Sequence, residues 1–201
     1  MSEQARLSIG DRWTYEKSFP RKRPKIIVGY RVVGSEKIED VNTLIIDWEE
    51  RLRGGEGPLI SGKFWIDEET ERFVKGERMF HDESGGMLET EALGKFRLGN
   101  WGIRGHARVP RTLEVGDRWS FEDSGRLNQV SVTSLEETRV PAGAFECYVV
   151  VTEVRRDGLE FTFKSWYSKK LGILVKSVAR NPEGVTTGKT ELVSYVIKEL
   201  K

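Results

Sequence analysis

The residues best suited to acid–base or metal chemistry in this sequence are its two histidines, His81 and His106. His81 is followed by Asp82–Ser84, which supplies the residue types of a metal site or of a Ser/His/Asp arrangement. A pair of glycines comes next, and this favours a polar loop tip. The chain contains no Gly-x-Ser-x-Gly elbow and no His-x-x-x-His pair. We therefore expect no catalytic residues, no metal site and no enzymatic activity.

Cys147 is the only cysteine, so the chain can form neither an internal disulfide nor a zinc site built from thiolates. The sequence does not exclude a disulfide between two chains, and it does not indicate the redox compartment. In a period-two pattern Cys147 shares a strand face with Phe145, Val149 and Val151. We expect a buried, unreactive thiol rather than a nucleophile.

The densest positive cluster consists of Arg21, Lys22, Arg23 and Lys25, with Pro24 among them. Four such cations can contact an anionic lipid or a phosphate group, each adding about 1 kcal/mol at a strongly anionic surface. The alternative is a charged hairpin tip, which Pro24 and the flanking strands favour. The cluster is therefore a candidate anionic contact with a structural alternative.

The acidic run Asp67–Glu71 lacks the alternating oxygen ligands of a calcium loop and lies between two predicted strands. We expect it to be a solvated hairpin turn. The chain contains no phosphate-binding glycine-rich loop before a helix and no dinucleotide fingerprint. The sequence therefore predicts no cofactor.

Composition excludes several classes of protein. The 201 residues include 33 Lys and Arg against 32 Asp and Glu, so the formal charge is +1 and the two signs are interspersed. Such a chain lacks the positive field that holds proteins on nucleic acid. With 37% hydrophobic residues and six Trp it can bury a core. Asn and Gln are scarce beside the charged residues, which is typical of thermophilic proteins.

The start of the chain is polar, and no window approaches the ~20 apolar residues of a membrane span. We expect no transmembrane segment and a soluble chain. As given it would be cytoplasmic, whereas removal of a leader would make an envelope or secreted location equally consistent. The compartment stays unknown.

An internal repeat organises the sequence. Leu7–Glu16 returns as Leu113–Glu122 with six identities in ten positions, and Thr90–Leu93 matches Thr190–Val193. Between these matches the residues Lys63, Trp65, Val74 and Lys75 align with Lys164, Trp166, Val175 and Lys176. We predict a first repeat over 1–98, a linker over 99–112 and a second repeat over 113–201, the two repeats packing as one unit.

The start of each copy reads Gly-Asp-Arg-Trp. Gly and Asp suit the turn that enters a strand, while Arg12 and Arg118 can stack on a Trp or pair with a carboxylate. An enzyme seldom needs its site twice. Recurrence in both copies therefore favours a structural role over catalysis.

Alternating residues predict strands. Leu44, Ile46, Trp48 and Leu52 share one face, and similar patterns cover 12–19 and 159–167. Gly-rich and Pro-rich turns separate these runs, which predicts an antiparallel all-β fold. The segment 88–98 has the composition of a helix, but its counterpart in the second copy is a strand, so we predict a strand. About six strands per copy predict a barrel or two facing half-barrels.

The segments Val140–Tyr148, Trp166–Ser168, Leu171–Lys176 and Glu191–Tyr195 resemble those of a widespread set of uncharacterised prokaryotic β proteins. The folds of that set are similar to the half-barrels of lipoprotein carriers. The resemblance is clearest over 113–196. It implies this architecture and, for function, a concave apolar face that can hold an acyl chain.

Three functional hypotheses follow. The first is a non-catalytic carrier of a hydrophobic or lipid-like small molecule. The second is an interaction or scaffold module that binds an unknown partner through exposed strands. The third is an enzyme with an unrecognised site. Candidate ligand contacts are the aromatic residues of the predicted strands, which can alternatively fill the core: Trp13, Tyr15, Trp48, Trp65, Trp119, Phe121, Phe161 and Trp166.

Overall fold

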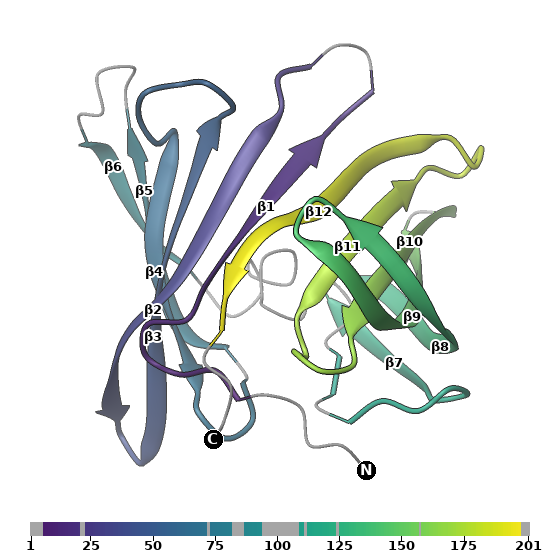
Figure 1. The fold of residues 1–201 in the computed structure, drawn as a ribbon, viewed down its shortest axis with the longest axis horizontal. Coiled ribbons are helices and arrows are strands. Elements are labelled where there is room, and N and C mark those ends of the chain that lie inside the picture. Colours follow the sequence, from purple (N-terminus) through teal and green to yellow (C-terminus); the bar gives the residue numbers. More distant parts are fainter. Residues whose placement is uncertain are drawn as a thin grey trace. The chain divides into compact units, whose positions relative to one another are not determined.

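The computed structural model describes residues 6–20, 23–71, 73–81, 87–93, 109–110, 112–123, 125–156 and 158–197. Strands and turns make up this part of the chain, which confirms the all-β prediction for it (Figure 1). No helix able to cross a bilayer occurs among these residues. The first six strands are β1 (Arg12–Ser18), β2 (Ile26–Ile38), β3 (Val41–Leu52), β4 (Ile60–Asp67), β5 (Phe73–His81) and β6 (Met87–Leu93). The others are β7 (Arg118–Asp123), β8 (Arg126–Val140), β9 (Gly143–Arg156), β10 (Leu159–Ser168), β11 (Leu174–Arg180) and β12 (Thr186–Val196).

The chain divides into two compact units. The described residues of the first unit fall within Leu7–Lys17, Pro24–Leu98 and Val193–Lys201, and those of the second fall within Met1–Arg6, Ser18–Arg23 and Gly99–Leu192. Consecutive strands pair antiparallel in the order β1 to β6 and again in the order β7 to β12. Within the described residues neither run pairs its first strand with its last, so neither closes. The expectation of a closed barrel is therefore wrong for this part of the chain.

The ambiguous segment 88–98 is a strand as far as the structure describes it. Residues 88–93 lie in β6, which pairs with β5 from Gly76 opposite Leu93 to His81 opposite Met87. Propensity favours a helix here, but hydrogen bonding to β5 fixes the extended conformation. Residues 94–98 lie outside the described residues, and so does most of the predicted linker 99–112.

The two Gly-Asp turns make the same hydrogen bonds, which confirms their structural role. In the first turn Gly10 N–H donates to Val32 O at 2.8 Å, and Val32 N–H donates to Asp11 O at 2.9 Å. In the second, Gly116 N–H donates to Val132 O and Val132 N–H donates to Asp117 O, both at 2.9 Å. Positive φ angles of 98° and 104° explain the glycine at the third position of each turn, Ser8–Asp11 and Glu114–Asp117.

In each turn the aspartate carboxylate accepts a hydrogen bond from the backbone N–H three residues earlier. Asp11 Oδ2 accepts the Ser8 N–H at 2.7 Å, and Asp117 Oδ2 accepts the Glu114 N–H at 2.8 Å. Asp11 is fully buried whereas Asp117 is half-buried. Removal of the buried carboxylate should cost more stability than removal of the half-buried one, because the backbone donors that it leaves behind cannot bind water instead.

We therefore expect Asp11→Ala to lower the free energy of unfolding by about 2 kcal/mol and Asp117→Ala by about 1 kcal/mol. Urea unfolding of the two single variants measures both losses. Equal losses, or a larger loss for Asp117→Ala, would contradict the dependence on burial.

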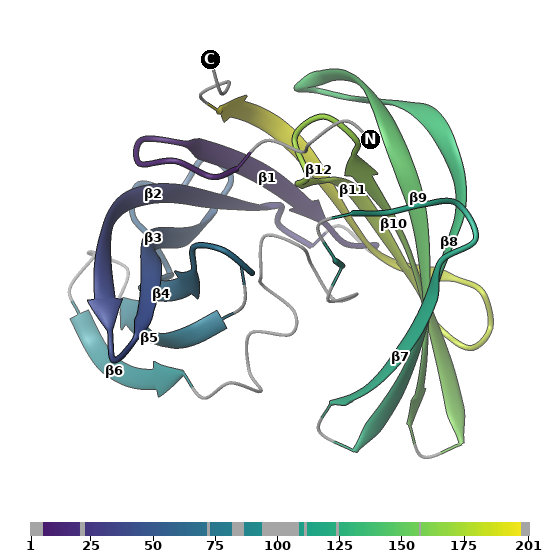
Figure 2. The same ribbon diagram turned by 90° about the horizontal axis from the view of Figure 1, so that it is seen from below.

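A β-bulge interrupts each of the two longest hairpins. The register of β2 with β3 shifts between Val32 and Gly34, and that of β8 with β9 shifts between Val132 and Ser134. A bulge increases local twist and bends the strand that carries it. The bending of β2 and β3 is visible in Figure 2. Val32 and Val132 are both buried beside their bulges.

Each unit has its own core. In the first, Trp13 stacks on Tyr30 with ring centroids 5.5 Å apart, and Tyr15 and Phe64 meet Tyr30 edge-on. In the second, a buried cluster consists of Val109, Leu113, Val130, Val132, Val150 and Tyr167. The predicted alternation in β3 is confirmed at Leu44, Ile46 and Trp48, which are buried, but Leu52 is 38% exposed at the end of its strand.

Candidate functional site

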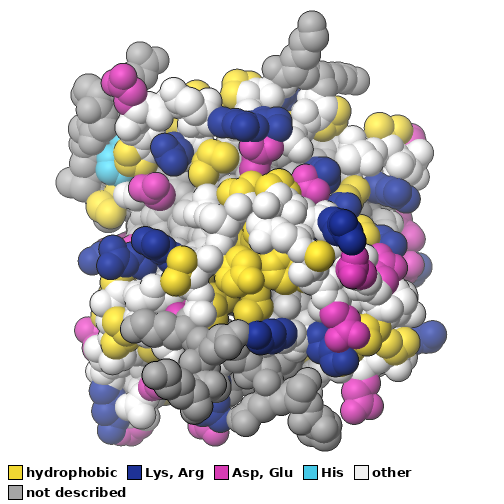
Figure 3. All heavy atoms as spheres, in the orientation of Figure 1, with side chains coloured by type: hydrophobic (Ala, Val, Ile, Leu, Met, Phe, Trp, Pro, Cys, Tyr) yellow, Lys and Arg dark blue, Asp and Glu magenta, His cyan; other side chains and the backbone are white. Residues whose placement is uncertain are grey.

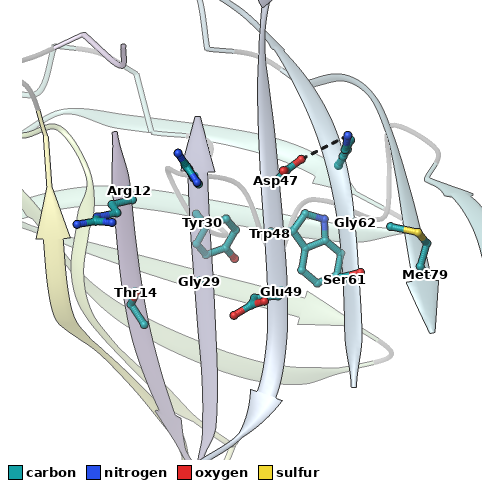
Figure 4. Close-up of a pocket in the computed structure, with 12 residues that line it drawn as sticks. Arg12, Thr14, Gly29, Tyr30, Asp47, Trp48, Glu49, Ser61, Gly62 and Met79 are labelled. Atoms are coloured by element: carbon teal, nitrogen blue, oxygen red, sulfur yellow. Dashed lines mark ion pairs between the residues drawn. The ribbon is translucent and has the colours of Figure 1, made fainter. Parts of the chain in front are cut away.

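A concavity of about 420 Å³ lies in the first unit, across strands β1 to β5 (Figure 4). Its size is within the range of small-molecule sites, about 300–1,000 Å³. Carbon atoms form most of its lining. This concavity is the candidate functional site, and we call it the β1–β5 concavity.

Two rows of cross-strand neighbours form its rim. The register places Arg12 opposite Arg31, Arg31 opposite Asp47, and Asp47 opposite Lys63. The next row on the same face, two residues along each strand, consists of Thr14, Gly29, Glu49, Ser61 and Met79.

The row between them alternates in direction with the two rim rows, and Tyr30, Trp48 and Gly62 of this middle row also line the concavity. It consists of Trp13, Tyr30, Trp48, Gly62 and Arg78. The Trp48 ring lies against Gly62, where an added Cβ would be 2.8 Å from Trp48 Nε1. Gly29 has no side chain, which leaves space in the concavity at this position. The aromatic core of the first unit packs beneath the same strands.

The charged residues of the rim differ in whether they have a partner of opposite charge. Lys63 Nζ lies 3.8 Å from Asp47 Oδ1, and Arg51 Nε lies 4.0 Å from Glu49 Oε1. Both carboxylates of the rim therefore have a cation of their own. Arg12 and Arg31 are exposed and form no ion pair within the described residues.

Ser61 in the rim is hydrogen bonded to a histidine. Its Oγ lies 2.7 Å from His81 Nε2, because β4 and β5 are neighbours. The sequence offered no signal for this pair, since 20 residues separate Ser61 from His81. The partners considered from sequence, Asp82–Ser84, and the second histidine, His106, lie outside the described residues.

The eight candidate aromatic residues do not gather around the concavity, and of them only Trp48 lines it. Trp13 and Tyr15 are 1% and 5% exposed in the core of the first unit. Trp65 lies on the opposite face from Trp48, where Lys75 Nζ stands 4.3 Å from its ring centroid. Alternation along β3 and β4 separates these rings because successive residues point to opposite faces.

The other four aromatic residues lie in the second unit. Trp119 and Phe121 pack on the buried cluster, and Phe161 is half-buried opposite Val154. Trp166 is 8% exposed, and its Nε1–H donates to Glu136 Oε1 at 2.6 Å. Lys164 and Lys176 place their ammonium groups 4.8 and 4.9 Å from the centroid of the same ring.

The basic cluster is only partly described, because Arg21 and Lys22 lie outside the described residues. Arg23 is exposed, and Lys25 Nζ is paired with Glu16 Oε1 at 2.6 Å. Arg53 Nη1 binds the other oxygen of the same carboxylate, also at 2.6 Å. Lys25 is therefore engaged within the chain. On the visible face of Figure 3 cations and anions are interspersed, as the composition predicts.

One ion pair of the first unit has a buried carboxylate and a half-buried ammonium group. Lys17 Nζ lies 2.8 Å from Glu50 Oε1, and the Glu50 side chain is 7% exposed. Burial lowers the pKa of Lys17, while the charge of Glu50 and its hydrogen bond act in the opposite direction. Burial, together with the same carboxylate, raises the pKa of Tyr30 above its usual value. The two charges satisfy each other, so we assign the pair to the core.

Cys147 is fully buried, as predicted. Burial raises the pKa of its thiol to about 12; the hydrogen bond with Thr138 acts in the opposite direction, and the carboxylates of Glu136 and Glu146 act in the same direction as burial. We expect the native protein at pH 8 to resist Ellman's reagent, since the thiolate is the reactive form. Labelling in urea should follow global unfolding. Rapid labelling of the native chain would contradict this burial.

The same shift predicts a pH dependence. Above about pH 9 the thiol of the unfolded chain loses its proton while the folded chain keeps it until about pH 12. The unfolded state then binds fewer protons, so this group lowers stability as the pH rises through that window.

No protein-family model matches the chain, and no curated protein is significantly similar in sequence. The fold is similar to that of a Bacteroides fragilis protein that is inferred to be exported and has a YMCC-like fold. The TM-score is 0.52 at 13% identity, over 98% of this chain and 100% of the other. A Parabacteroides distasonis protein inferred to be a lipoprotein matches with a TM-score of 0.48 at 13% identity, over 96% and 97%. The first match agrees with the predicted resemblance to uncharacterised prokaryotic β proteins at the level of fold.

Proposed function

We propose that the chain is a non-catalytic binding protein that carries a lipid-like small molecule in the β1–β5 concavity. The observation that supports this proposal is an open concavity of about 420 Å³ with a lining made mostly of carbon atoms. A charged rim beside an apolar lining suits an amphiphile better than a purely hydrophobic ligand. This differs from a groove built of the eight aromatic residues, most of which fill the cores.

The environment of Ser61 supports a non-catalytic role. An acyl-transfer site needs donors aimed at the oxyanion, most often backbone N–H groups. β4 lies between β3 and β5, so the backbone groups beside Ser61 are used in the sheet. A serine hydrogen bonded to a histidine is not sufficient for catalysis without such donors.

The test uses N-phenyl-1-naphthylamine, a neutral apolar dye that fluoresces on leaving water. We expect saturable binding with one site per chain. Gly29→Leu should lower the affinity at least tenfold, about 1.4 kcal/mol, because its side chain would occupy the concavity. An added Cβ at Gly29 meets its nearest atoms, Glu49 Cγ and Oε1, only at 3.6 and 3.9 Å.

Gly29→Ala is the matched control, and it should bind the dye as the wild type does. Absence of saturable binding, or equal affinity of Gly29→Leu and the wild type, would overturn the carrier proposal. Hydrolysis of a dodecanoyl ester by the wild type but not by Ser61→Ala would overturn the non-catalytic part and favour the enzyme hypothesis. Reproducible capture of one protein through an exposed strand would favour the scaffold hypothesis instead.

We also propose that the two runs of strands arose by duplication of one unit. The shared Gly-Asp turns and the bulges at Val32/Gly34 and Val132/Ser134 support this. So do the bulges at Trp65/Ile66 and Trp166/Tyr167, each beside a Trp with a cation over its ring. An experimental structure in which the two runs do not superpose strand by strand would contradict this origin.

A further inference from the structure

We propose that Arg12 and Arg31 bind the anionic group of the ligand, a carboxylate or a phosphate. The β1–β5 concavity would thus select anionic amphiphiles over neutral or cationic ones. The inference rests on the proposed function for the apolar part of the ligand, whereas the anion site itself depends only on the two arginines.

The first argument is the register of β1 and β2. Arg12 lies directly opposite Arg31, and like charges in directly opposed positions destabilise a sheet. In Figure 4 the Arg12 side chain extends away from β2, as repulsion between the two guanidinium groups favours. An anion between them would remove the repulsion and add charge-assisted hydrogen bonds.

The second argument is that each nearby carboxylate has another cation within 4.0 Å. Lys63 pairs with Asp47, and Arg51 approaches Glu49. Further along β1, Glu16 is held by Lys25 and Arg53. Two positive charges therefore remain at the β1–β2 side of the concavity without a counterion in the described part of the chain.

The third argument is the space beside the two arginines. The neighbouring cross-strand pair on the same face is Thr14 opposite Gly29, a short hydroxyl side chain and no side chain at all. Arg12, Arg31, Thr14 and Gly29 all line the concavity, so there is room for an anion beside these residues. Arginine offers two parallel N–H donors to an oxyanion, a geometry that lysine cannot reproduce.

The second unit provides a comparison. Arg118 occupies the position of Arg12 in the repeated Gly-Asp-Arg-Trp segment, but its cross-strand partner is Ser131. Only the first unit thus opposes two arginines at this position. Arg118→Gln is therefore the matched control for Arg12→Gln and Arg31→Gln.

The experiment measures displacement of N-phenyl-1-naphthylamine by dodecanoate, dodecyl phosphate, dodecanol and dodecyltrimethylammonium below their micellar concentrations. We expect each anion to displace the dye at concentrations about tenfold lower than dodecanol does, with the cation weakest. Arg12→Gln and Arg31→Gln should each abolish this preference, while Arg118→Gln keeps it. The ratio of dodecanoate to dodecyl phosphate distinguishes the two sources of the anion.

A second readout does not depend on the dye. Addition of inorganic phosphate to protein labelled with ¹⁵N-arginine should shift the side-chain Nε–H signals of Arg12 and Arg31 but not that of Arg118. The unfolding temperature of Arg31→Gln should be no lower than that of the wild type, because repulsion is relieved. If phosphate shifts the Nε–H signals of Arg12 and Arg31 but the dye does not bind, the carrier function is rejected and the anion site is retained. Equal displacement by dodecanol and dodecanoate, or absence of phosphate shifts, would overturn the inference.

Discussion

Gly62→Ala is expected to lower the free energy of unfolding by about 3 kcal/mol, at the upper end of the usual cost of overpacking. An added Cβ would lie 2.2 Å from the Glu77 carbonyl oxygen, 2.8 Å from Trp48 Nε1 and 3.0 Å from Arg78 Cα. Two of these atoms belong to the backbone of β5, so relief requires β4 and β5 to separate. Urea unfolding followed by tryptophan fluorescence measures the loss, with an unchanged slope against urea concentration.

Gly29→Ala is the control on the other face of the same sheet. Its added methyl group makes ordinary contact with Glu49, and alanine lowers the entropy of the unfolded chain. We expect the stability of this variant to equal or exceed that of the wild type by up to about 1 kcal/mol. If the two glycine variants were equally stable, the tight contact of Trp48 with Gly62 would be refuted.

Trp13→Ala is expected to cost about 4 kcal/mol, within the range for truncation of a buried aromatic ring. Trp13 is 1% exposed and stacks on Tyr30 with an interplanar angle of 11°. Its removal leaves a cavity that the paired strands β1 and β2 cannot close. Thermal and urea unfolding both report this loss.

Trp65→Ala is the matched control, because Trp65 is half-buried and contacts Lys75 at the surface of its sheet face. We expect a cost of about 1–2 kcal/mol from partial burial and the cation–π contact. The comparison also tests whether Trp13 is a ligand contact, as the sequence suggested. A stable Trp13→Ala variant that loses dye binding would show that Trp13 serves the ligand rather than the core.

The amino-acid sequence alone determined the class of fold and many of its local features. Alternation over residues 44–48 predicts a strand with one buried face, because side-chain direction in a strand has a period of two. The Gly-Asp pairs predict the entry turns, since glycine at Gly10 and Gly116 adopts a positive φ that other residues resist. Internal similarity predicted a strand over 88–98, where propensity favoured a helix, and residues 88–93 of this segment lie in β6.

Tertiary structure alone decided which residues share a site. Arg12 lies opposite Arg31, and Ser61 is hydrogen bonded to His81, only because their strands are paired in one particular register. A single sequence does not specify that register, and a shift of one residue would move every side chain to the other face. For the same reason the sequence did not determine which face of the sheet Trp48 and Trp65 each occupy. Composition indicated aromatic residues for a groove, but pairing of the strands placed most of them in the cores and left charged rows around the concavity.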